Sequence, residues 1–174
     1  NGLGLARNVG TEFRRYTTPQ IPSNIIVSLY RDTSDRLWIG TSNGATIYHE
    51  HKFNQIEDDK NVISAFITIG NDSTLLAASA GIQLYHNGRL DDFKTRSAAD
   101  SSNAQCFTLS GRKLWIGTTD NGVVCYDLTT KKSFTINKSN GLKSDFVYNI
   151  ITDEDENIWV GTGFGIHKIE LQNN

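Results

Sequence analysis

A short motif that recurs about every 40 residues constrains this chain more than any other feature of its sequence. Its copies are Leu-Trp-Ile-Gly-Thr at 37–41, Leu-Leu-Ala-Ala-Ser at 75–79, Leu-Trp-Ile-Gly-Thr at 114–118 and Ile-Trp-Val-Gly-Thr at 158–162. Leucine-rich and β-helix repeats are shorter than this period. Helical solenoids need a 3.6-residue periodicity of apolar residues, which the sequence does not show. The period therefore favours a repeat protein built from strands.

Each period contains four strand-like segments. In the first period they cover residues 26–30, 37–41, 45–48 and 53–56, and we name them strands A to D from the centre outward. Four short strands in about 40 residues are typical of a β-propeller blade. The motif itself is a nearly continuous apolar run, as expected for a strand that is covered on both faces. We predict an all-β chain, a β-propeller of four-stranded antiparallel blades.

Composition agrees with this fold class and excludes others. Ile, Val and Thr outnumber Ala, Leu and Glu, which argues against a helical bundle. The dipeptide Asn-Gly, which suits tight β-turns, occurs five times. A net charge of −2 gives no basic surface for nucleic acid. No apolar run approaches the roughly 18 residues of a transmembrane helix, so we expect contact with a membrane only through other parts of a longer protein.

The repeat order predicts where each blade lies. Residues 1–20 match strands C and D, and the last segment matches strands A to C without a D. The predicted divisions are an incomplete blade at 1–20, blades at 21–58, 59–95 and 96–138, and an incomplete blade at 139–174.

Two end states follow from this order. The first strands could complete the last blade, either in a small closed ring or by pairing two copies. Otherwise the chain is a partial ring of about four blades, cut from a larger propeller. Since the chain lacks an initiator Met, we favour the cut ring and expect self-association through its open blade edges.

The repeats resemble the two component regulator propeller family. Residues 144–166 follow that family's pattern closely, residues 23–44 align to it without a gap, and residues 113–126 match its second half. The second period departs from the pattern at Leu76 and Ala78, which replace Trp and Gly. The resemblance covers essentially the whole chain.

This resemblance implies a function. In that family the propeller is the extracytoplasmic sensor region of bacterial hybrid two-component sensor histidine kinases. The implied location is the periplasmic or extracellular side of a membrane-anchored protein, and the implied signal is often a carbohydrate. The motif is structural, so it identifies the fold and not the ligand.

Several local patterns favour structural over chemical roles. Cys106 and Cys125 fall on strands A and C of one blade, too far apart for a disulfide, so we predict two free buried thiols. The acidic run 153–157 lacks most of a calcium loop and matches a turn between strands A and B. The pair His49 and His51 offers too few ligands for zinc. We therefore predict no metal and no cofactor.

Two further patterns are also interpreted structurally. The glycines of residues 161–165 precede a strand and not a helix, which argues against a nucleotide-binding loop. The tryptophans at 38, 115 and 159 could stack on sugars, but their fixed place in strand B favours packing between blades.

The loops at the mouth of the propeller are where a ligand would bind. They carry amides, carboxylates and one aromatic ring, a set that suits hydrogen bonding to a sugar. The predicted ligand-binding residues are Asn24, Asn43, Asp120, Asn121, Asp145 and Phe164.

Three functional hypotheses are compatible with this sequence. The first is a sensory propeller segment without enzymatic activity or catalytic residues, which binds an oligosaccharide or another extracellular signal. The second is an enzyme resembling streptogramin lyase. That enzyme would need a histidine on the central loops, whereas all four histidines fall in or just after strand C. The third is a scaffold for protein–protein interaction.

Overall fold

The chain is an all-β protein built from antiparallel sheets. The computed structural model describes residues 2–56, 60–70, 72–100 and 103–170. Within this part the only helix is a single 3-10 turn, η1 (Ala98–Asp100), so no helix there is long enough to cross a membrane. Consecutive strands are neighbours in every sheet, which is the meander of a propeller blade. The predicted fold class, a partial β-propeller, is confirmed.

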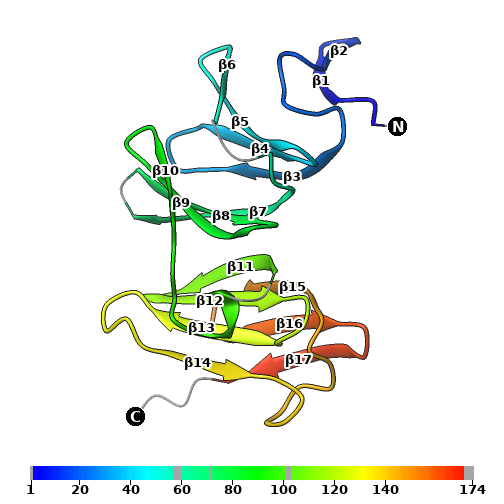
Figure 1. The fold of residues 1–174 in the computed structure, drawn as a ribbon. Coiled ribbons are helices and arrows are strands. Elements are labelled where there is room, and N and C mark those ends of the chain that lie inside the picture. Colours follow the sequence, from blue (N-terminus) through cyan, green and yellow to red (C-terminus); the bar gives the residue numbers. More distant parts are fainter. Residues whose placement is uncertain (1, 57–59, 71, 101–102, 171–174) are drawn as a thin grey trace. The chain divides into compact units, whose positions relative to one another are not determined.

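Five sheets follow one another along the chain (Figure 1). The first hairpin consists of β1 (Leu5–Val9) and β2 (Glu12–Tyr16). Blade 1 consists of β3 (Ile26–Arg31), β4 (Leu37–Thr41), β5 (Gly44–His49) and β6 (Lys52–Gln55). Blade 2 consists of β7 (Ile63–Gly70), β8 (Ser73–Ala78), β9 (Gly81–His86) and β10 (Arg89–Asp92). Blade 3 consists of β11 (Ala104–Ser110), β12 (Lys113–Thr118), β13 (Val123–Asp127) and β14 (Ser133–Ile136). The last blade has three strands, β15 (Val147–Thr152), β16 (Ile158–Thr162) and β17 (Gly165–Ile169).

The chain forms two compact units. The first comprises residues 1–79 and 84–91, with the first hairpin, blade 1 and most of blade 2. The second comprises residues 80–83 and 92–174, with blade 3 and the last blade. In the first unit β7 packs on β3 and β4, and in the second β15 packs on β11 and β12. The same contact between neighbouring blades therefore occurs once in each unit.

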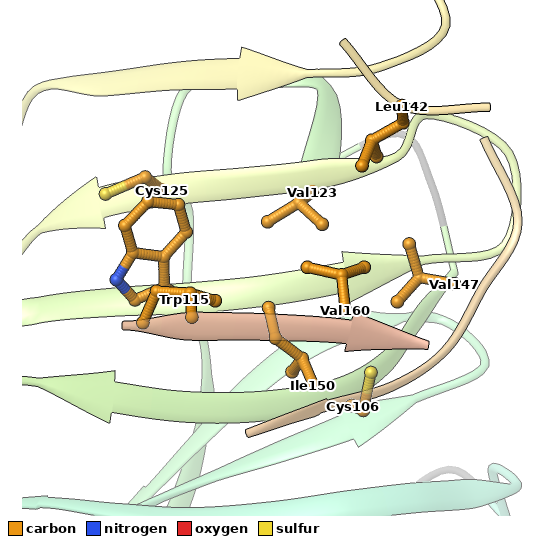
Figure 2. Packing of buried hydrophobic residues seen from close by; sticks show 9 residues of the cluster. Cys106, Trp115, Val123, Cys125, Leu142, Val147, Ile150 and Val160 are labelled. Atoms are coloured by element: carbon orange, nitrogen blue, oxygen red, sulfur yellow. The ribbon is translucent and has the colours of Figure 1, made fainter. Parts of the chain in front are cut away.

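Each contact encloses a hydrophobic core that contains a motif tryptophan. In the first unit the indole of Trp38 is fully buried and lies 5.7 Å from the ring of Phe66 in blade 2. In the second unit Trp115 is fully buried in a cluster with Cys106, Cys125 and Val160, among others (Figure 2). The predicted packing role of these two tryptophans is thus confirmed.

The small residue after the tryptophan lets the next blade approach closely. A Cβ atom on Gly40 would lie 2.6 Å from the carbonyl oxygen of Ile63, the first residue of β7. A Cβ atom on Gly117 would lie 2.7 Å from a methyl group of Val147, the first residue of β15. Both distances are shorter than van der Waals contact, so glycine at this position sets the spacing between blades.

A β-bulge recurs near the start of strand A. The register of the pairing between strands A and B shifts between Ile26 and Ser28, and it shifts at the corresponding place in β7, β11 and β15. A bulge leaves one residue unpaired and bends the strand, as is common near a functional rim. The sequence pattern did not predict it.

An aspartate holds the turn between strands A and B in two blades. In blade 1 the Asp32 carboxylate accepts hydrogen bonds from the Trp38 indole (2.8 Å), from the Arg36 side chain (2.6 Å) and from two backbone N–H groups. Asp153 receives the same kind of bond from Trp159, at 2.7 Å. The acidic run 153–157 is therefore a turn, and the described residues contain no metal-binding cluster of three or more His, Cys, Asp or Glu residues.

Blade 3 lacks this interaction because only two residues, 111–112, connect β11 and β12, whereas five, 32–36, connect β3 and β4, and because Ser110 stands where blade 1 has Asp32. As a result the buried indole nitrogen of Trp115 has no hydrogen-bond partner within the described part of the chain. Two tryptophans with the same position in the blade thus differ in one hydrogen bond.

This difference predicts unequal effects of the same substitution. Trp38→Phe should destabilise the chain more than Trp115→Phe, because only the first removes a hydrogen bond to a buried carboxylate, which keeps its other donors. The two changes remove a similar volume, so the difference in the free energy of unfolding should be about 1–3 kcal/mol. Urea unfolding followed by circular dichroism measures both, and equal losses would contradict the role given to the Asp32–Trp38 bond.

The same carboxylate predicts a dependence of stability on pH. Burial alone would raise the pKa of Asp32, but the hydrogen bonds from Trp38 and Arg36 and the charge of Arg36 outweigh it and lower the pKa. The stabilisation is therefore complete above the unfolded pKa of about 4 and is lost as the pH falls through the lower folded value. Asp32→Asn should be less stable than the wild type at neutral pH and should lose less stability on acidification. Parallel pH profiles from urea titrations would argue against this assignment.

Candidate functional site

The loops between strands B and C share one local structure in blade 1, blade 3 and the last blade, where the motif threonine builds it. Thr41 donates a hydrogen bond from its Oγ1 to the carbonyl of Gly44, at 2.7 Å. Its Oγ1 also accepts one from the backbone N–H of Asn43, at 3.1 Å. Thr118 and Thr162 make the corresponding pairs of bonds in blade 3 and the last blade. The threonine therefore fixes the turn that follows the buried strand B.

Three predicted ligand residues occupy this turn. Asn43, Asn121 and Phe164 are the residues whose backbone N–H groups the threonines hold. Asn43 is exposed, Asn121 is half-buried and Phe164 is 73% exposed. Asp120 is exposed in the longer turn of blade 3, where its Oδ1 accepts a hydrogen bond from the Asn121 amide at 3.2 Å.

The other two predicted residues precede strand A. The side-chain oxygen of Asn24 accepts a hydrogen bond from the backbone N–H of Thr18 (2.9 Å). The carboxylate of Asp145 accepts one from the backbone N–H of Lys138 (2.7 Å). These two side chains, which we expected to bind a ligand, therefore also form hydrogen bonds that shape the loop between strands D and A.

Backbone hydrogen bonds bring the two kinds of loop together. In the first unit the N–H of Gly4 donates to the carbonyl of Asn24 (2.9 Å), and that of Gly44 donates to the carbonyl of Asn61 (2.6 Å). In the second unit the N–H of Gly122 donates to the carbonyl of Asp145 (2.8 Å). The glycine at the start of strand C therefore donates its N–H to a carbonyl two residues before the next strand A. Each such junction places the side chains of two blades at one rim.

The six predicted ligand-binding residues do not lie together in one site: five of them form two groups, and the sixth stands apart. Asn24 and Asn43 line a shallow hollow of about 540 Å³ in the first unit. We name it the asparagine hollow; Gly2, Thr18, Pro22, Ser23 and Ile25 complete its lining. In the second unit the Gly122–Asp145 bond brings Asp120 and Asn121 near Asp145. Phe164 belongs to neither group.

The asparagine hollow has polar groups available for a ligand. Among the described residues, no hydrogen bond uses the side chain of Asn43 or the amide nitrogen of Asn24. Donors and acceptors on a rim beside the apolar surface of Pro22 and Ile25 could bind a hydroxylated ligand.

A second hollow, of about 600 Å³, lies beside the first hairpin and was not predicted. We name it the aromatic hollow; its lining includes Leu5, Arg7, Tyr16, Leu29, Tyr48, His49, His51 and Phe53. The rings of Tyr48 and Phe53 lie 4.7 Å apart, and those of Tyr16 and Phe53 lie 4.9 Å apart. Arg7 donates to the Tyr48 hydroxyl at 3.0 Å. The hollow thus combines aromatic surface with charged side chains of both signs, Arg7 and Arg31 on one hand and Asp35 and Glu50 on the other.

The aromatic hollow has only a weak signal in the sequence. Arg7 and Tyr48 lie 41 residues apart, on strands of two different sheets, so no local motif connects them. His49 and His51 stood out as a pair, but the structure places them at the end of β5 farthest from Asn43. All four histidines lie in or just after β5, β9 and β17, as predicted.

The two cysteines are free and buried, as predicted. Burial raises the pKa of Cys106 to about 12, although a hydrogen bond with the backbone of Gly117 opposes it. Burial likewise raises the pKa of Cys125 to about 11. A thiolate is the reactive form of cysteine, so neither side chain is placed to act as a nucleophile.

This environment predicts slow thiol chemistry. At mildly alkaline pH both cysteines should resist alkylation by iodoacetamide in the folded chain and should react fully in denaturant. Mass spectrometry of the alkylated peptides counts the modified thiols. Rapid labelling of either cysteine without denaturant would show that its environment is more open than described.

A family model matches two of the repeats. The family model described as two component regulator propeller matches residues 20–43 and 141–164, which contain β3–β4 and β15–β16. The resemblance found in the sequence is thereby confirmed for these two segments. No curated protein sequence matches the chain.

Solved structures share the fold. The extracellular domain assigned to the hybrid two component system BT4673 from B. thetaiotaomicron is similar with a TM-score of 0.77 and 23% identity. That match covers 89% of this chain and 21% of the other. The extracellular domain assigned to the hybrid two component system BT3049 from the same organism is similar with a TM-score of 0.77 and 21% identity. This match covers 92% of this chain and 23% of the other.

A third similar structure belongs to a different system. PorZ, a surface component of the type-IX secretion system of Porphyromonas gingivalis, gives a TM-score of 0.71 at 12% identity, with 92% of this chain and 28% of PorZ covered. The chain spans less than a third of each of these three structures. At such identities the likeness shows the fold alone.

Proposed function

Since two segments of this chain are two component regulator propeller repeats, we propose that it is part of the extracellular sensory propeller of a membrane-anchored hybrid two component system. The match of both repeats carries the proposal. Two structures with the same fold, assigned to such systems, support it. In this proposal the chain has no enzymatic activity of its own, and a kinase elsewhere in the protein would transmit the signal.

We further propose that the rim of the loops binds the signal. The structure of these loops supports this, because the motif threonine and the glycine N–H groups hold the rim rigidly while Asn43 keeps its side chain available. Preorganised polar groups lose little conformational entropy on binding. Amide groups beside apolar surface suit a carbohydrate, and the asparagine hollow is the part of the rim that we assign to it.

The mechanism would be a rigid-body change. A ligand that bridges two loops of neighbouring blades stabilises one relative placement of two sensor subunits over another. The ligand can shift the equilibrium between the two placements only by the difference between its binding free energies for them. Such a change could be transmitted through a membrane without a change of fold.

Calorimetry tests the carbohydrate assignment. The chain is titrated with a panel of neutral and acidic oligosaccharides. We expect heat of binding with at least one of them, and a loss of at least tenfold in affinity when Asn24 and Asn43 are both changed to Ala, which corresponds to about 1.4 kcal/mol. Asn54→Ala, an exposed asparagine on β6 outside the hollow, is the matched control. No binding by any sugar, or equal losses in variant and control, would contradict the assignment.

The sensory role has a separate test. The gene that encodes this chain should also encode a membrane helix followed by a histidine kinase core. A stop codon soon after residue 174 would contradict the proposal.

A further inference from the structure

A groove between the first hairpin and blade 1 carries two arginine side chains beside aromatic rings. We name it the outer groove. It has a volume of about 330 Å³, and its lining includes Arg7, Arg14, Gln20, Tyr48, His51 and Phe53. It adjoins the aromatic hollow and shares several residues with it, but no Asp or Glu belongs to the described residues that line the groove. The outer groove is therefore an electropositive surface with aromatic walls.

The outer strands of two neighbouring sheets form both walls of the groove. On one side lie β1 and β2, and on the other lie β5 and β6. In blade 1 the strand β5 lies between β4 and β6, so a further strand beside β1 would pair with the edge of β1 that faces away from β2. Such a strand would lie inward, beside the aromatic hollow, and we therefore assign no ligand to that hollow. The outer groove does not depend on it.

The two arginines carry like charges that lie opposite each other. Arg7 of β1 pairs with Arg14 of β2, so both side chains leave the same face of the hairpin. Like charges in this position destabilise a sheet. Arg7 donates a hydrogen bond to the Tyr48 hydroxyl at 3.0 Å, and the Arg14 guanidinium lies over the Tyr16 ring, 5.7 Å from its centroid. Within the described part of the chain, neither arginine forms an ion pair with an acid.

The fold itself does not require arginines at these positions. The residue three places after the glycine at the start of strand C is Arg7 in the hairpin, Ile47 in blade 1 and Cys125 in blade 3. Ile47 and Cys125 are buried, and they pair with Asn54 and Phe134 on strand D. Of these three sheets, only the hairpin has a pair of like charges there. A structural role in the blade therefore does not explain the pair.

We propose that the outer groove binds an acidic saccharide. Its carboxylate lies between the guanidinium groups of Arg7 and Arg14, which donate charge-assisted hydrogen bonds and lose their mutual repulsion. Its ring lies against Tyr48 and Phe53, whose rings are 4.7 Å apart and form one aromatic surface. A volume near the lower limit of small-molecule sites suits one or two sugar rings.

The geometry favours a saccharide over an acidic peptide. Extended peptides bind to a sheet by pairing with an exposed edge, where backbone hydrogen bonds provide the affinity. Arg7 and Arg14 leave the face of the hairpin and not its edge. A peptide held by these side chains would therefore gain no strand pairing, whereas a sugar ring needs only the carboxylate contacts and the aromatic surface.

Calorimetry with two matched disaccharides tests the proposal. Digalacturonate carries carboxylates, and the neutral disaccharide of galactose has the same linkage without them. The chain should bind digalacturonate, more weakly as the salt concentration rises, and should bind the neutral sugar about tenfold or more weakly. Sodium sulfate and a tetraglutamate peptide, titrated separately, show whether the saccharide ring contributes to binding.

Two substitutions on one strand locate the site. Arg14→Gln should weaken the binding of digalacturonate about tenfold or more. Arg15→Gln is the matched control, because Arg15 pairs with Ala6 and leaves the opposite face of the hairpin, and its binding should match that of the wild type. Both variants lose one positive charge, so a difference between them does not come from net charge. Thermal unfolding should show Arg14→Gln to be at least as stable as the wild type, since the change removes a repulsion.

Two further variants separate this site from other parts of the chain. Phe53→Leu should weaken the binding of digalacturonate without any change of charge, because it removes one ring of the aromatic wall. The double change of Asn24 and Asn43 to Ala should leave that binding unaltered. The outcome at the outer groove is therefore independent of the carbohydrate assignment at the rim.

Four results would overturn the proposal. No heat of binding with digalacturonate excludes the acidic saccharide as the ligand. Equal affinity for sulfate shows an adventitious ion only, and tighter binding of tetraglutamate indicates a peptide in its place. Equal losses in folded Arg14→Gln and Arg15→Gln show a general effect of surface charge and no site in the groove.

Discussion

The close approach of one blade to the next over a small residue is the constraint on which the rest of this structure depends. Strand B is buried on both faces, so its side chains must fit two neighbours at once. The motif meets this requirement by placing a large indole beside a residue with little or no side chain. At Gly40 the backbone carbonyl of Ile63, and at Gly117 the side chain of Val147, occupy the space that a Cβ atom would need; both residues belong to the following blade. The spacing of the blades, and with it the position of every loop, follows from this contact.

The same contact organises the rim. Because strand A of the next blade lies directly over strand B, the glycine that begins strand C can donate its N–H to the residue before that strand A, as Gly44 does to Asn61. The rim therefore consists of paired loops on a rigid scaffold and not of independent flexible ones. A rim of this kind can present polar side chains from two blades to one ligand. This is the physical basis for assigning a recognition function to residues such as Asn24 and Asn43.

The sequence predicted those features that depend on local pattern. The spacing of the tryptophans predicted the blades. The assignment of Cys106 to strand A and Cys125 to strand C, with strand B between them, predicted that the two cysteines would remain unpaired. Features that depend on contacts distant in sequence were missed. The aromatic hollow joins Arg7 to Tyr48, and the bulge in strand A is a shift in its pairing with strand B. The ligand residues were chosen for their polarity, which could not show that the side chains of Asn24 and Asp145 are partly used to shape their own loops.

A comparison of two glycines tests the central constraint most directly. Gly40 lies under the next blade, whereas Gly161 has the same place in its own blade and no cover. In dilute solution, Gly40→Ala should lower the free energy of unfolding by about 1–3 kcal/mol, the usual effect of overpacking. Gly161→Ala should leave it unchanged or raise it by up to about 1 kcal/mol. Equal losses at the two positions, measured by urea unfolding, would show that the approach of the next blade is not what requires glycine in the motif.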